Sequence, residues 1–163
     1  MSSDFLGTPP MESEYNAITW TDIRVSQTCL TPDTICLIVQ CNFLRDKSWF
    51  NGDSASFELI SHERVHFDIS EYATRILRRK LSHHQSKSIE QTSEYVKMAY
   101  QQIKQIETEL TEQFDRETNH GTDYDNQQEW VDIINKKLDS ESRFQNKYIY
   151  VIRLKQDVFK NTK

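Results

Sequence analysis

The sequence predicts an α+β domain in which two strands precede three helices and a last strand ends the pattern. Three observations support this prediction. Residues 34–43 form an apolar run rich in β-branched side chains, and residues 54–81 and 88–119 repeat apolar side chains at helical spacing. Strands and helices that are segregated along the chain are typical of the α+β class. The length of 163 residues fits a single domain, residues 1–163.

The bulk composition excludes several classes of protein. Hydrophobic residues make up 36% and charged residues 28% of the chain, and glycine and proline number three each, so a low-complexity chain is excluded. The net charge of −5 gives no reason to expect a nucleic-acid partner, because phosphate binding needs clustered Lys and Arg. No apolar run is long enough for a membrane span, and no signal peptide is visible. These features alone favour a cytoplasmic protein or one whose export signal has been removed.

The first third of the chain is expected to form an arm and two strands. Residues 1–14 contain one glycine and two prolines and predict an irregular N-terminal arm. Residues 15–26 have a mixed pattern that we interpret as a strand. Residues 31–33 are a turn signal, and residues 34–43 predict a buried strand from their length and β-branched content.

The three cysteines are Cys29, Cys36 and Cys41, and an odd count excludes a fully paired framework. Cys36 and Cys41 lie at odd spacing in one predicted strand, so they point to opposite faces and cannot pair with each other. We therefore expect buried free thiols.

A turn at residues 51–54 is expected to lead into a long helix over residues 54–81, with Asp53 or Ser54 as its N-cap. The polar residues 82–84 predict the end of this helix. Its buried side is expected to consist of Phe57, Leu59, Ile60, Val65, Ile69, Ala73, Ile76 and Leu77.

Two further helices and a strand are expected after it. Residues 88–119 predict a helix of roughly 45 Å, and Gly121 directly after it is a C-cap signal. Residues 125–128 resemble a capping box that opens a third helix. Residues 148–152 predict the last strand. The third helix is expected to bury Trp130, Ile133, Ile134 and Leu138.

The strongest chemical signal is the motif His-Glu-x-x-His at residues 62–66. His62 and His66 lie one turn apart on one helix face, so both imidazoles can bind one metal ion at about 2.0–2.1 Å. Glu63 is angled towards the open side of the metal, where it can take a proton from water and pass it to a leaving amine. The motif therefore predicts a zinc-dependent hydrolase, in particular a peptidase. The alternative is that the motif has no chemical function and consists of two histidines on a helix surface beside an ordinary glutamate.

A catalytic zinc usually has three protein ligands, and spacing alone leaves the third one open. His120 lies at the end of the second predicted helix. Asp125 ends residues 121–125, which resemble the Gly-Thr-x-x-Asp segment of aspzincin peptidases, although an N-cap also explains it. Glu90 or Glu94 would correspond to the helix-borne glutamate of thermolysin-like enzymes, although both fit ordinary solvated helix charges.

Several further segments of the chain, taken together with the metal motif, resemble one protein family. They are residues 4–10, 15–19, 41–43, 48–49, 62–69, 73–75, 77–78, 114–121 and 128–130. Together these segments resemble a bacterial family of unknown function whose members are predicted to be secreted zinc-dependent proteases. Residues 114–121 are similar to its Tyr-Asp-x-x-Thr-x-His-Gly motif, with Phe114 in place of the common tyrosine. The resemblance covers nearly the whole chain except the last strand.

The resemblance implies a zincin-like fold, with a small antiparallel sheet packed on the His-Glu-x-x-His helix and a long second helix. It also implies that His120 is the third zinc ligand. Asp115 and Thr118 would then have supporting roles, with Asp115 as an acceptor for the second N–H of a metal-binding imidazole. The family's location would be secreted or periplasmic, which differs from the cytoplasmic location that the chain alone leaves open.

The expected partner is a peptide or protein substrate, and the oligomeric state is not predicted. Tyr124 is a candidate for stabilising the oxyanion, although an ordinary half-buried tyrosine fits the sequence equally well. Two other functions compete with the hydrolase. One is a non-catalytic protein in which zinc ties the two long helices together. The other is a metal-free interaction module that presents the long second helix.

Overall fold

The computed structural model describes residues 4–31, 34–52, 56–147 and 149–153, the last five by their backbone alone. Its described part has a mixed α+β architecture, as the sequence predicts. The helices are α1 (Phe57–Ser82), α2 (Ile89–Glu117), α3 (Tyr124–Ser140) and the short 3₁₀ helix η3 (Ser142–Phe144). The strands are β1 (Ala17–Ile18), β2 (Thr21–Thr31), β3 (Thr34–Phe43), β4 (Trp49–Phe50) and β5 (Ile149–Arg153).

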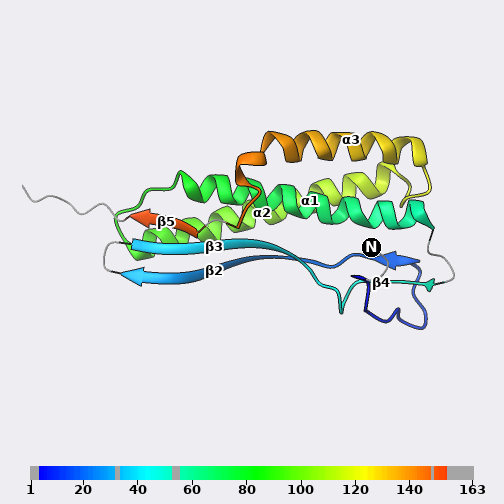
Figure 1. Cartoon of the computed structure of the whole chain (residues 1–163), viewed down its shortest axis with the longest axis horizontal. Coiled ribbons are helices and arrows are strands. Elements are labelled where there is room, and N and C mark those ends of the chain that lie inside the picture. The colour runs from blue at the N-terminus through cyan, green and yellow to red at the C-terminus, as the bar shows by residue number, and fades with distance from the viewer. Residues whose placement is uncertain (1–3, 32–33, 53–55, 148, 154–163) are drawn as a thin grey trace, which may run out of the picture.

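The strands form two small antiparallel sheets. One sheet has the order β2-β3-β5, and the other pairs β1 with β4. The long β2–β3 hairpin runs along the pair of helices α1 and α2, while α3 packs on the other side of α1 (Figure 1). Helix α1 begins and α2 ends at the same end of the molecule, next to β1 and β4, and this end carries the candidate site.

The strand predictions are confirmed in part. Strand β3 has the bounds predicted for it, and residues 4–14 contain no strand and no α-helix. The strand predicted over residues 15–26 is instead divided into β1 and β2, and β2 continues to Thr31. The division occurs where the hydroxyl of Thr19 donates to the carbonyl of Glu63 and the backbone N–H of Trp20 donates to Ser48. The turn predicted at residues 31–33 lies mostly outside the described residues.

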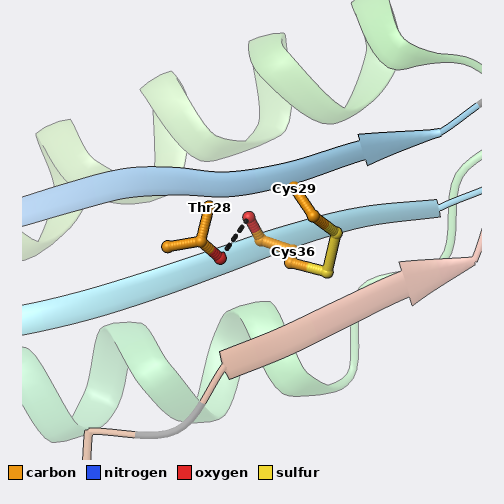
Figure 2. The surroundings of a disulfide bond; sticks show 3 residues. All are labelled: Thr28, Cys29 and Cys36. Carbon is orange, nitrogen blue, oxygen red and sulfur yellow. Dashed lines mark hydrogen bonds between the residues drawn. A yellow bond between two sulfur atoms is a disulfide. The ribbon is translucent and has the colours of Figure 1, made fainter.

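The expectation of free thiols is wrong for two of the three cysteines. Cys29 and Cys36 form a disulfide across the β2–β3 hairpin, where they are register partners with Cα atoms 4.8 Å apart (Figure 2). A bulge between Gln27 and Cys29 shifts this register, and the hydroxyl of Thr28 donates to the carbonyl of Cys36 beside the bond. Only the pairing of Cys36 with Cys41 was excluded by strand geometry. Cys41 is a free thiol, and burial raises its pKa to about 12.

The helix boundaries differ slightly from those predicted, because the capping residues differ. Helix α1 is capped by Ser56, whose hydroxyl accepts from the N–H of Leu59, while Asp53 and Ser54 lie outside the described residues. Phe57, which was expected in the core, is 83% exposed because it lies in the first turn of α1. The cap of α3 is Asp123 and not a residue within 125–128.

Two apolar clusters hold the elements together. One joins α1 and α2 to the β2–β3 hairpin. The other joins the three helices through Val65, Ile69, Phe114, Trp130 and Ile134. Ile133, expected to be buried, is 40% exposed, since it lies beside the inward face of α3 and not on it. None of the helices in the described part of the chain combines the length and the apolar composition that a membrane span requires.

Candidate metal site

The first half of the site comes from the beginning of α1. His62, Glu63 and His66 each offer a ligand atom, and these atoms lie within 4.8 Å of one another. His62 and Glu63 are buried, and His66 is half-buried. The helical spacing of four residues places the two imidazole Nε2 atoms 3.2 Å apart. The sequence prediction that His62 and His66 share one helix face is therefore confirmed.

The second half comes from the end of α2. Asp115 Oδ1 lies 3.2 Å from His62 Nε2 and 3.1 Å from His66 Nε2. The family resemblance implies that Asp115 accepts from the second N–H of a metal-binding imidazole, but its contacts are with the Nε2 atoms of both histidines. Burial raises the pKa of Asp115, but the hydrogen bonds from His62 and His66 outweigh it and hold the pKa well below its usual range. Asp115 is therefore a carboxylate at neutral pH.

A tight turn after α2 fixes Asp115 and contacts His62. Thr118 is fully buried, and its hydroxyl donates to the carbonyl of Phe114 and accepts from the N–H of Gly121. The N–H of His120 donates to the carbonyl of Asp115 at 2.8 Å. Gly121 has a φ of +82°, and a Cβ there would lie 2.9 Å from Cγ of His62. Glycine is thus required both by the backbone and by the imidazole packed against it.

Phe114 forms the apolar wall behind the imidazoles. Its ring stacks on His62 with centroids 4.5 Å apart and meets the edge of His66 at 5.2 Å. On its other side it contacts Trp130 of α3 at 5.5 Å. The side chain is fully buried, so the hydroxyl of the tyrosine common in the resembling family would need a buried partner at this position. Phe114 therefore serves as packing that orients both rings.

Two polar atoms of the site lack a hydrogen-bond partner among the described residues. They are Nδ1 of His62 and Oε2 of Glu63, and both are buried. A buried polar atom without a partner costs about 1–3 kcal/mol. Such a cost at two adjacent residues is typical of a site that binds or transforms something, because a purely structural cluster would pair its atoms.

The site opens into a cavity of about 630 Å³ between β1, α1 and α2. Its wall includes the two histidines, Glu63, Asp115 and His120. About two turns before Asp115 on α2, the same wall contains a buried polar cluster in which Ser70 of α1 donates to Glu107 at 2.5 Å, and Glu107 also pairs with Lys104. Glu63 additionally lines a second cavity of about 170 Å³, which is bordered by Phe5, Phe43 and Phe67.

The remaining predicted residues lie in different places. His120 lines the main cavity, but its ring is exposed and forms no hydrogen bond or ion pair with any described residue. Tyr124 and Asp125 lie in the first turn of α3, are exposed and do not line this cavity. Glu90 and Glu94 are exposed in the first two turns of α2, at least about 30 Å along the helix from Asp115. The structure thus brings Asp115 to the histidines and leaves the other carboxylate candidates away from them.

Sequence reasoning missed the parts played by Phe114 and Gly121. Both lie in the segment 114–121 that carries the family resemblance, and the C-cap signal at Gly121 predicted a turn there, but neither signal indicated a contact with His62. The buried Glu107 was also missed, because a single glutamate in a charged helix has no distinguishing pattern. No protein-family model, no curated protein and no solved structure shows a significant match to this chain.

Proposed function

We propose that this protein is a zinc-dependent hydrolase, and more specifically a peptidase, with a zincin-like site on α1. The observation that carries the proposal is the convergence of His62, Glu63 and His66 at the wall of a large cavity, with ligand atoms within 4.8 Å of one another. The donor set fits zinc, since imidazole nitrogens and carboxylate oxygens are its usual ligands. His62 and His66 would hold the ion, and Glu63 would be the general base.

When bound, zinc would acidify a water molecule and polarise the carbonyl of the scissile amide. Glu63 takes the proton from the attacking water as its oxygen bonds to the carbonyl carbon. It then gives this proton to the amide nitrogen as the C–N bond breaks. The unpaired Oε2 of Glu63 supports this role, because that atom has no structural partner among the described residues to compete for it.

The shape and lining of the cavities support a peptide as substrate. The main cavity is long enough to involve α1 from Leu59 to Ser70 and α2 from Lys104 to Asp115, which suits an extended chain. The smaller cavity shares Glu63 with it and is bordered by three phenylalanines, so it suits an apolar side chain next to the scissile bond.

The location proposed for the protein is outside the cytoplasm. The disulfide between Cys29 and Cys36 supports this, because such bonds form and persist in oxidising compartments.

A second candidate function is a non-catalytic protein that zinc stabilises. It is favoured by the way in which the site joins α1 to the end of α2 through His62, His66 and Asp115. The two candidates differ in the role of Glu63. The hydrolase requires it as the general base, whereas a structural zinc site does not require it.

The variant Glu63→Gln tests the proposal. We expect it to retain zinc, measured by elemental analysis, and to lose turnover of a mixed peptide library by about 10²–10⁴-fold, because the general base is removed. Glu94→Gln is the matched control, since it removes the same charge from an exposed position on α2. Full turnover in Glu63→Gln, or wild-type protein that contains zinc and cleaves no peptide or other amide, would contradict a hydrolase that uses Glu63.

A further inference from the structure

We propose that Asp115 is the third protein ligand of the metal, so that the ligand set is His62, His66 and Asp115, and that His120 is not a ligand. The inference rests on the proposed function for the identity of the metal. It replaces the ligand that the family resemblance implies with one that the geometry supports.

The spacing of the three donor atoms suits one metal ion. His62 Nε2, His66 Nε2 and Asp115 Oδ1 form a nearly equilateral triangle with edges of 3.1–3.2 Å. In a tetrahedral zinc site with bonds of about 2.0–2.1 Å, any two ligand atoms lie about 3.3 Å apart. One ion above this triangle would therefore reach all three atoms with very small movements.

The three atoms of the triangle carry too few protons for every short contact to be a hydrogen bond. Each Nε2 atom carries at most one proton and the carboxylate carries none, so at most two of the three short contacts can be hydrogen bonds. The third contact then brings two N–H groups close together. A cation instead binds a lone pair of each atom, and it accounts for all three contacts at once.

Hydrogen bonds and packing contacts hold Asp115 in place next to His62. The N–H of His120 holds the carbonyl of Asp115, and the hydroxyl of Thr118 holds the carbonyl of Phe114, so the last turn of α2 is tied at both positions. Phe114 and Gly121 meanwhile pack on the ring of His62. The segment 114–121 thus positions one carboxylate and one imidazole relative to each other, as a ligand pair requires.

The position of His120 favours a role other than metal binding. Its backbone serves the turn, with a φ of +54°, while its exposed ring has no hydrogen-bond partner among the described residues. Phe114 and Gly121 both pack on the ring of His62. The ring of His120, in contrast, makes no ring contact with His62 or His66. His120 is therefore free to contact a substrate in the cavity rather than the metal.

The experiment measures zinc affinity of the full chain by competition with a chromophoric chelator. We expect Asp115→Ala to bind zinc at least about 100-fold more weakly than wild type, Asp115→Asn at least about tenfold more weakly, and His120→Ala within about threefold of wild type. Cobalt(II) is the second probe. Its visible absorption bands should change strongly in the Asp115 variants and stay close to those of wild type in His120→Ala, because these bands mainly report the identity and number of the ligands.

The controls separate ligand loss from unfolding. Asp132→Asn removes an exposed aspartate of α3 and should leave zinc affinity unchanged. Asp115→Asn keeps the shape of the side chain, and circular dichroism in EDTA should show wild-type helix content.

The outcomes distinguish the two proposals. Asp115 variants that bind zinc as tightly as wild type, or a large loss in His120→Ala, would overturn the ligand assignment while wild-type zinc binding and the Glu63 test stand. Wild-type protein that binds no zinc would overturn both. A protein whose zinc depends on Asp115 but whose turnover ignores Glu63 would overturn the proposed function alone.

Discussion

Helix α1 carries two buried polar clusters that differ in how completely their atoms are paired. The first is the candidate metal site at residues 62–66. The second lies about three turns further on and consists of Glu71, Arg75 and Arg78. Both clusters place ionisable groups inside the protein, and burying such groups is costly unless they are paired.

The second cluster meets this requirement. The side chain of Arg78 is 1% exposed, and it donates to Glu71 and to the backbone carbonyls of Val39, Phe144 and Gln145. Arg75 donates to Glu71 as well and to a carbonyl at the end of α3. No buried side-chain atom of these three residues lacks a partner among the described residues. This cluster joins α1 to β3, α3 and η3, so we regard it as structural.

The metal site contrasts with this arrangement. Two of its buried atoms have no partner among the described residues, and two nitrogens meet without a donor–acceptor pattern that satisfies every contact. One helix can therefore hold both a structural and a functional polar cluster. Burial and charge do not distinguish the two clusters, but the presence or absence of a hydrogen-bond partner for each buried atom does.

The largest expected effect is at the structural cluster. Arg78→Met should lower the free energy of unfolding by about 3–5 kcal/mol, because three backbone carbonyls lose their donor and Glu71 loses one of its two cationic partners. Urea denaturation of the full chain measures it. Arg64→Met is the matched control on the same helix, since Arg64 is largely exposed and its pair with Asp68 is worth at most about 1 kcal/mol. Similar losses of unfolding free energy in both variants would show that the hydrogen bonds of Arg78 contribute no more to stability than an exposed ion pair.

An intermediate effect is expected at the turn that supports the site. Gly121→Ala should cost about 1–3 kcal/mol of stability, because alanine is strained at a φ of +82° and its Cβ would meet the ring of His62. Zinc affinity should fall by about tenfold or more as that ring is displaced. Gly52→Ala is the matched control, since a Cβ there meets nothing within 4 Å. Zinc affinity is measured by chelator competition. Unchanged affinity in Gly121→Ala would show that the turn does not position His62 for metal binding.

Much of the fold could be predicted from sequence because its signals are local. Strand β3 was predicted with its bounds, and the three helices were predicted within a few residues, since periodicity depends only on the helix itself. The disulfide could not be predicted, because the pairing of Cys29 with Cys36 depends on the hairpin register and on the bulge before Cys29. Register of this kind is set between strands and not within one.

The candidate site divides in the same way. His62, Glu63 and His66 could be predicted because one helical turn brings them together. The contact of Asp115 with both histidines could not, because it depends on how the end of α2 packs against α1. The close approach of Gly121 to His62 has the same origin. The family resemblance drew attention to residues 114–121, but the part played by each residue there follows only from the packing.

The smallest expected effect is at Glu63 of the metal site, and the same kind of substitution in the structural cluster should have the opposite sign. Glu63→Leu should raise the free energy of unfolding by about 1 kcal/mol in EDTA, because it replaces a buried carboxylate oxygen that has no partner with an apolar group of similar size. Glu71→Leu should instead destabilise the protein, because Arg75 and Arg78 would both lose their carboxylate. Urea denaturation of the two variants side by side measures the difference. A loss of stability in Glu63→Leu as large as that in Glu71→Leu would mean that Glu63 stabilises the fold, and the distinction between the two clusters would then fail.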